Sequence, residues 1–87
     1  MIFDSVKTKE LLVAWLEGDC TDNILLTSIL DECRPLVESI VSTYDFRERE
    51  DMIQEVFLKY IEALKKYNTE GNLYSFLCVV ANNVCST

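Results

Sequence analysis

Helix-breaking residues are scarce in this chain, and their scarcity constrains its fold more than any other feature. The 87 residues include only two glycines, Gly18 and Gly71, and one proline, Pro35. Glycine and proline are the residues that most often end helices and form turns. Between them, apolar residues recur at spacings of three and four, the period of an amphipathic helix, and no strand pattern competes. The sequence therefore predicts an all-α fold, a compact bundle of about four helices.

The helical pattern falls into four segments. We expect helices over about residues 8–17, 24–44, 47–66 and 73–84, the first ended by Gly18 and carrying a buried Trp15. Pro35 lies inside the second segment, so we expect a kink or a break just before it. Residues 1–22 then form an N-terminal helix and loop, and residues 23–87 form the main helical domain, within one compact domain overall.

The charge balance argues against two classes of function. Fifteen acidic and eight basic residues give a net charge of −7, which repels a nucleic-acid backbone. The chain has no histidine, so it lacks the commonest general base and zinc ligand. Paired carboxylates such as Glu48 and Asp51 are all that remains for acid–base chemistry, in a chain too short to build a large pocket around them. We therefore expect no enzyme, no catalytic residue, no cofactor and no metal site.

The four cysteines form no CxxC pair and follow no leader segment. They are expected to be reduced, buried thiols, as is usual in the cytoplasm. The apolar stretches are far shorter than the roughly 20 residues that cross a bilayer. The sequence thus predicts a soluble cytoplasmic protein with no membrane contact.

The third predicted helix divides into two unlike halves. One half is apolar and is expected in the core; it carries Met52, Ile53, Val56, Phe57, Tyr60, Ile61, Leu64 and Tyr67. On the other half, Leu58 lies in the middle of a ring of polar groups: Asp51, Gln54, Glu55, Glu62 and Lys65. An apolar centre with a charged rim is typical of a contact surface for another protein. The alternative is an ordinary solvated helix face with a single exposed leucine.

The same helix carries a family resemblance. Its segment DMIQEVFL, residues 51–58, resembles the "DLxQEvFL" stretch of the core-binding helix of bacterial sigma factors. Upstream, RPLVESI at 34–40 is similar to "yxPLVxxIA" of the preceding sigma helix. Downstream, residues 61–77 resemble "AxxkfdprGsFxxWL", and ANNVC at 81–85 stands where extracytoplasmic-function sigma factors show "ARNLC". Together the resemblance covers about residues 30–85, the conserved second region of sigma factors.

The resemblance implies a partner for the polar half of this helix. In sigma factors this half docks on the clamp helices of the largest RNA polymerase subunit, which present arginines. Carried over by position, Asp51, Gln54 and Glu55 would be the polar and acidic contacts, and Leu58 would be the apolar anchor. Glu62 and Lys65 would form the far rim of the surface. Carboxylates facing arginines form charge-assisted hydrogen bonds that are geometrically selective.

The promoter-reading part of the resemblance is reduced. Sigma factors use aromatic and basic side chains of the next helix to hold flipped bases and phosphates. Here the only charged residue from Tyr67 to the end of the chain is Glu70. Tyr74 could stack on a base, and Asn82 and Asn83 are the other candidates for DNA contact. We therefore expect promoter DNA to be bound only within the holoenzyme.

Three functions follow from these observations. The first is a sigma-like transcription factor, or its second-region domain, that binds RNA polymerase core and contributes to promoter-specific initiation. The second is a decoy of the kind expected from bacteriophages, which occupies the sigma site and inhibits host polymerase; the net charge of −7 favours it. The third is a helical adaptor unrelated to polymerase. Small divergent sigma-like proteins of bacteriophages resemble this chain in having a recognisable core-binding helix and a reduced promoter-reading surface. A second phage or host transcription protein is therefore a further candidate partner.

Overall fold

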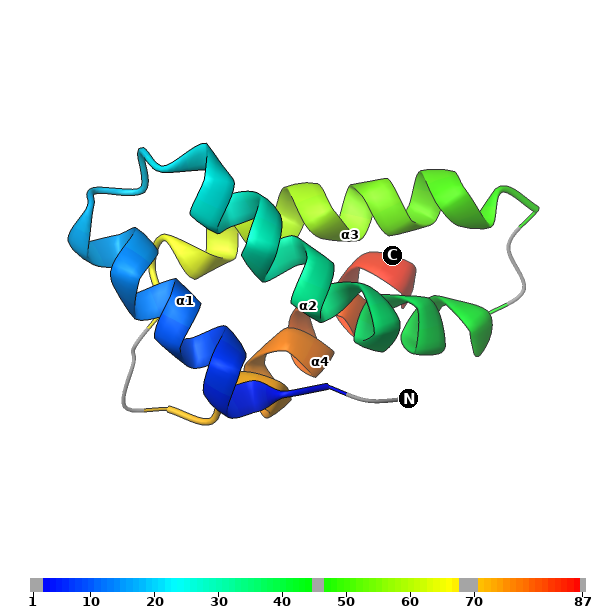
Figure 1. Cartoon of the computed structure of the whole chain (residues 1–87). Helices are drawn as coiled ribbons and strands as arrows, with labels where there is room; N and C mark the ends of the chain where they lie inside the picture. Colours follow the sequence, from blue (N-terminus) through cyan, green and yellow to red (C-terminus); the bar gives the residue numbers. More distant parts are fainter. Residues whose placement is uncertain (1–2, 45–46, 68–70, 87) are drawn as a thin grey trace.

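The protein is a four-helix bundle. The computed structural model describes residues 3–44, 47–67 and 71–86, and these form α1 (Ser5–Glu17), α2 (Asn23–Ser42), α3 (Arg49–Leu64) and α4 (Leu73–Ser86) (Figure 1). No strand occurs among the described residues. The predicted all-α bundle is therefore confirmed.

Three of the four helices begin at a polar residue that caps them. Asp4, Asp22 and Asn72 each accept hydrogen bonds from backbone N–H groups of the first turn of α1, α2 and α4, at 3.0–3.1 Å. Such caps satisfy N–H groups that have no partner within the helix. Because Asp4 is the cap, α1 begins at Ser5, three residues earlier than predicted. The residue before α3, Glu48, makes no side-chain capping bond.

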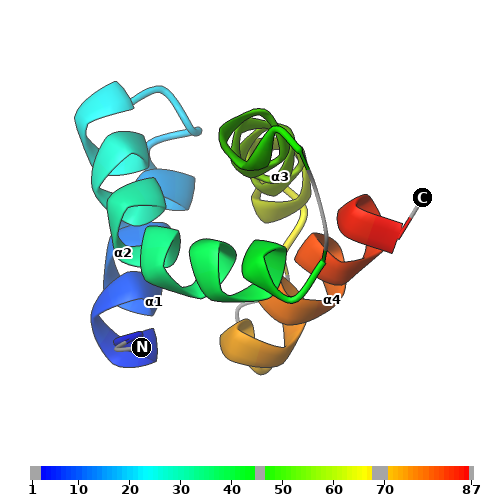
Figure 2. The same cartoon turned by 90° about the vertical axis from the view of Figure 1, so that its right-hand side faces the viewer.

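Pro35 does not break α2. The helix is continuous from Asn23 to Ser42 with the proline inside it, which excludes the break and leaves the kink of the two predicted alternatives. The ribbon of α2 instead changes direction along its length in both views (Figure 1, Figure 2). A proline removes one backbone hydrogen bond and crowds the preceding turn, which bends a helix when packing holds both halves in place. Buried residues on either side of it, Cys33 and Leu36, provide that packing.

The core draws side chains from all four helices. Trp15 is 1% exposed and lies in it, as predicted. The apolar half of α3 is also directed inward: Ile53, Val56, Tyr60 and Leu64 are buried, whereas Met52, Phe57 and Ile61 are partly buried. The remaining buried apolar residues are Leu12, Ile29, Cys33, Leu36, Val37, Val41, Tyr67, Leu73, Leu77, Ala81 and Cys85.

The helices pack in sequence-adjacent pairs. α1 packs on α2 and α3 packs on α4, while α2 also contacts both α3 and α4 (Figure 2). An ion pair of 2.7 Å from Lys7 to Glu32 joins α1 to α2. α1 also touches α4, so it is part of the bundle rather than an appendage. None of the helices in the described ranges is long and apolar enough to span a membrane.

The cysteines differ in their environment. Cys33 and Cys85 are buried, as predicted, whereas Cys20 and Cys78 are only partly buried, and all four are free thiols. Removal from water disfavours a thiolate, and burial accordingly raises the pKa of Cys33 to about 12. Cys33 therefore behaves as an apolar core residue of α2.

One buried hydrogen bond joins α3 to α4, and it generates a stability prediction. The Tyr60 hydroxyl donates to the carbonyl oxygen of Leu77 at 2.9 Å. Tyr60→Phe keeps the ring and removes this bond, so the free energy of unfolding should fall by about 1 kcal/mol. Tyr74→Phe is the control, because Tyr74 is 43% exposed. Urea unfolding checks both variants, and a Tyr60→Phe variant as stable as the parent would contradict the importance of this bond.

Candidate functional site

The outer side of α3 carries the predicted contact surface. The six predicted contact residues are all exposed: Asp51, Gln54, Glu55, Leu58, Glu62 and Lys65. Five of them belong to α3, and Lys65 is its C-terminal boundary residue. At about 100° of rotation per residue they occupy one sector roughly 100° wide. We call this set the α3 stripe. The structure therefore brings all six predicted contact residues together on one side of one helix.

Leu58 is the apolar centre of the stripe. It is 60% exposed, although the opposite half of α3 is packed into the core. Because the opposite half of α3 faces the core, the side chain of Leu58 points away from α2 and α4 and cannot be buried within the bundle. A single exposed leucine is common on protein surfaces, but this one is surrounded on its own helix by carboxylates, an amide and an amine.

Charge changes sign along α3. Carboxylates outnumber cations towards its N-terminal end, where Glu48, Glu50, Asp51 and Glu55 accompany Arg47 and Arg49. Cations outnumber carboxylates towards its C-terminal end, where Lys59, Lys65 and Lys66 accompany Glu62. This order suits the helix dipole, whose N-terminus is positive and whose C-terminus is negative. Within it, Lys59 pairs with Glu62 at 3.4 Å. The N-terminal half of the stripe is thus the part that can receive a partner's cations.

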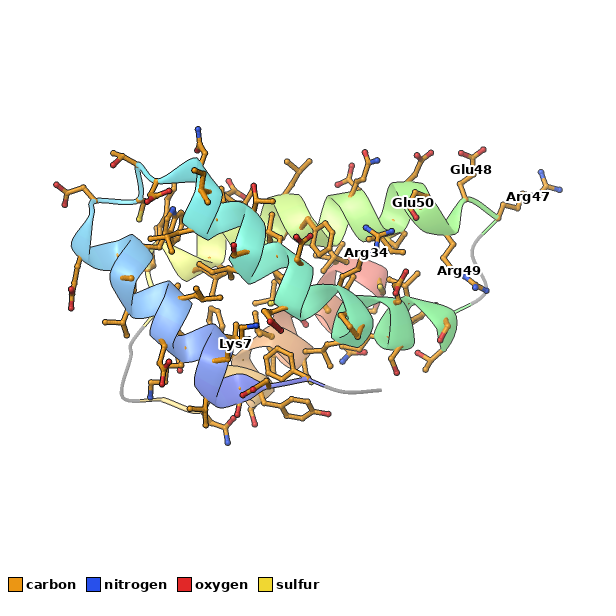
Figure 3. The ribbon with its side chains drawn as sticks, in the orientation of Figure 1. Lys7, Arg34, Arg47, Glu48, Arg49 and Glu50 are labelled. Atoms are coloured by element: carbon orange, nitrogen blue, oxygen red, sulfur yellow. The ribbon has the colours of Figure 1, made fainter. Side chains whose placement is uncertain are left out.

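The first turn of α3 is tied to α2 by Arg34. The Nη2 atom of Arg34 donates to both carboxylate oxygens of Glu50, at 2.8 and 3.1 Å, and its Nε lies 3.4 Å from Glu38 (Figure 3). These contacts raise the pKa of Arg34, mainly through the hydrogen bond to Glu50. Glu50 therefore faces α2 and is not part of the α3 stripe, while the next residue, Asp51, faces outward. The sequence pattern did not indicate this pairing.

Two carboxylates lie together at the start of the same helix. A hydrogen bond to Asp51, together with repulsion from its charge, raises the pKa of Glu48. Both side chains are exposed to solvent. A pair of exposed carboxylates with no enclosing pocket offers neither a bound substrate nor a water-excluded site. The pair is instead a local source of repulsion in the first turn.

An open groove runs between α3 and α4, next to the α3 stripe. Its volume is about 750 Å³. Glu55 and Glu62 belong to both the groove and the stripe, so the two surfaces are continuous. The other lining residues are Met52, Lys59, Ala63, Lys66, Val80, Asn83 and Val84. Sequence reasoning missed this groove because it depends on how two helices pack.

The three candidate DNA-contacting residues are exposed on α4. The ring of Tyr74 lies 5.9 Å from that of Phe3, which leaves the tyrosine 43% exposed. The Asn82 amide already makes two bonds: it accepts from the Tyr44 hydroxyl and donates to the Cys78 carbonyl, both at 2.8 Å. Asn83 lines the groove. Helix α4 itself contains no charged residue.

The carboxylate pair at the start of α3 generates a pH prediction. Because the pKa of Glu48 is raised in the folded chain, this pair destabilises the fold above that pKa, and the effect fades as the pH falls through it. Glu48→Ser removes the charge and supplies a capping hydroxyl. Its Tm at neutral pH should therefore exceed that of the parent chain, and the difference should narrow in acid.

Glu48→Gln is the companion variant, because it removes the charge without adding a good cap. Its gain in Tm should be smaller than that of Glu48→Ser and should disappear in acid. Thermal melting followed by circular dichroism at neutral and acidic pH measures both variants. A Glu48→Ser chain that melts below the parent at neutral pH would show that the pair does not destabilise α3.

The chain matches a known protein family. The model of the sigma-70 region 2 family matches residues 29–87, which is more than half of the chain. The match begins within α2 and includes α3 and α4, so it contains every residue of the α3 stripe. α1 lies outside it. Searches of curated proteins and of solved structures found no significant match.

Proposed function

Because the chain belongs to the sigma-70 region 2 family, we propose that the α3 stripe binds the clamp helices of the largest RNA polymerase subunit. Sigma region 2 is a non-enzymatic domain of transcription factors that bind RNA polymerase core. Membership of this family supports a sigma-like role for the chain in transcription initiation. The observation that carries the proposal is the exposure of Leu58 within a ring of polar side chains on a helix whose other half is buried.

Each part of the stripe has a distinct task in this proposal. Asp51 and Glu55 accept hydrogen bonds from arginines of the clamp helices, and Gln54 adds neutral hydrogen bonds between them. Leu58 loses its remaining contact with water, and burying a leucine fully contributes about 1.5–3 kcal/mol. Glu62 and Lys65 form the rim, where charges act on association rate and selectivity more than on affinity.

Promoter DNA is contacted only once polymerase holds it. Tyr74 offers an exposed ring for stacking on a base, and Asn83 and the free hydrogen-bonding capacity of Asn82 lie on the same helix. Without a cation on α4, phosphates are neutralised by polymerase or by a second phage or host transcription protein. The same lack of cations favours a second candidate function, a decoy that occupies the sigma site and inhibits host polymerase.

The binding proposal is tested by variants within the α3 stripe. Glu55→Lys places a cation against the arginines of the clamp helices and should weaken binding of polymerase core at least tenfold. Gln54→Ala should also weaken it. Because both residues are exposed, Tm should stay close to that of the parent chain. Titration of labelled chain with purified core measures the affinity, and the host's primary sigma factor should displace the chain.

Glu17→Lys is the matched control for charge, because Glu17 is exposed at the end of α1, outside the family match. It should bind core as well as the parent chain does. Unchanged binding by both stripe variants would contradict the assignment of α3 as the docking helix. If no polymerase subunit were retained by the parent chain, the protein would be a helical adaptor for another partner.

Transcription in a purified system separates initiation from inhibition. A sigma-like factor added to core should give transcripts from a promoter, and Tyr74→Ala should reduce their yield without changing core affinity. A decoy should give none and should suppress transcription by the host holoenzyme, with Glu55→Lys losing the suppression. Transcripts that depend on the added chain would rule out the decoy.

A further inference from the structure

The N-terminus of α3 is built differently from those of the other three helices. Asp4, Asp22 and Asn72 cap α1, α2 and α4 through their side chains, whereas Glu48 forms no capping bond for α3. Glu48 is also repelled by Asp51, one turn further on. The helix that carries the docking surface therefore begins without the local interactions that normally fix a first turn.

Arg34 of α2 holds the first turn of α3 in another way, through a side chain of that turn and not through its backbone N–H groups. One nitrogen of its guanidinium, Nη2, donates to both carboxylate oxygens of Glu50 in the first turn of α3, at 2.8 and 3.1 Å. The carbon at the centre of the same guanidinium lies 5.9 Å from the ring centre of Phe57. Planar guanidinium groups suit both a carboxylate fork and an aromatic face. One side chain thus holds α3 at two positions.

The spacing of these two positions determines what Arg34 controls. Glu50 and Phe57 are two helical turns apart on the same side of α3, about 10 Å along its axis. Contact at two such points opposes both rotation of the helix about its axis and fraying of its first turn. On the helical wheel the α3 stripe lies roughly 90° from this side, so the orientation of Asp51 and Leu58 depends on the same contacts.

The guanidinium is itself held in place from within α2. Glu38, one turn after Arg34, lies 3.4 Å from its Nε. Pairs of opposite charge four residues apart stabilise a helix and restrict both side chains. Arg34 thus has three partners, whereas an isolated surface ion pair has one, and its side chain is 40% exposed.

We propose that Arg34 is a positioning residue for polymerase binding, which holds the first two turns of α3 so that the α3 stripe meets its partner already ordered. The consequence for binding rests on the proposed function, whereas the ordering of α3 does not. Preordered surfaces bind more tightly because less conformational freedom is lost on association.

The test combines hydrogen exchange with polymerase binding. Arg34→Met removes the donors and keeps a side chain of similar reach. Exchange at the amides of residues 52–54 should become about three- to tenfold faster. Core affinity should fall by a similar factor, with little change in Tm. Arg34→Lys keeps the charge without the fork and should give an intermediate result.

Two further variants make the test specific. Arg34→Glu combined with Glu50→Arg rebuilds the ion pair between α2 and α3 with its partners exchanged. Exchange should be slower and core affinity higher than in Arg34→Glu alone, although both should fall short of the parent chain because the contacts with Phe57 and Glu38 are lost. Lys7→Met breaks the 2.7 Å ion pair of Lys7 with Glu32, another link to α2, and should change neither readout for α3.

Each outcome of this test is decisive. Unchanged exchange at residues 52–54 in Arg34→Met would overturn the proposal. Faster exchange with unchanged core affinity would also overturn it, because the stripe would then not depend on Arg34. Lower affinity with unchanged exchange would show instead that Arg34 touches polymerase directly. If the parent chain failed to bind core, the proposed function would fail, and exchange alone would decide whether Arg34 orders α3.

Discussion

The burial of one half of α3 against α2 and α4 is the constraint on which the rest of the structure depends. Tyr60 lies at its centre, fully buried and hydrogen-bonded to α4. When one half of a helix is fixed in a core, the helical period determines which residues on its other half are exposed to solvent. The exposure of Leu58 and the carboxylates beside it is thus a direct consequence of core packing.

The distribution of charge limits what this surface can do. All the charges of α3 lie outside the core, and α4 carries none. The molecule therefore has an acidic helix, α3, beside an uncharged one, α4, on a chain of net charge −7. Protein partners with exposed arginines suit the first helix, while the second cannot hold a phosphate backbone by itself. In the proposed function, binding to polymerase therefore comes first and any DNA contact follows it.

Much of the fold could be predicted from the sequence, because helical periodicity and turn residues are local signals. The inward half of α3, the burial of Trp15 and the exposure of Leu58 all follow from spacing alone. The local rule for proline predicted a kink or a break at Pro35 but could not choose between them, because that choice depends on the packing of buried residues such as Cys33 and Leu36 on either side. Pairings between distant residues were also beyond sequence reasoning: Arg34 with Glu50, and Tyr44 with Asn82, are set by how the helices pack. The proposed contact residues come from the motif, and their role stays a prediction; the contacts of Arg34 with α3 have no signal in the motif.

If the α3 stripe binds RNA polymerase, Leu58 lies at the middle of the contact. The most direct measurement replaces Leu58 with a photoreactive phenylalanine analogue and irradiates the chain mixed with purified polymerase core. One crosslink is expected, to the coiled-coil clamp helices of the largest subunit. It should be lost when the same chain also carries Glu55→Lys, and when the primary sigma factor is present in excess. A crosslink from position 58 to another subunit would contradict this contact, and so would the absence of any crosslink from position 58. The same analogue at Glu17 is the control and should give no crosslink.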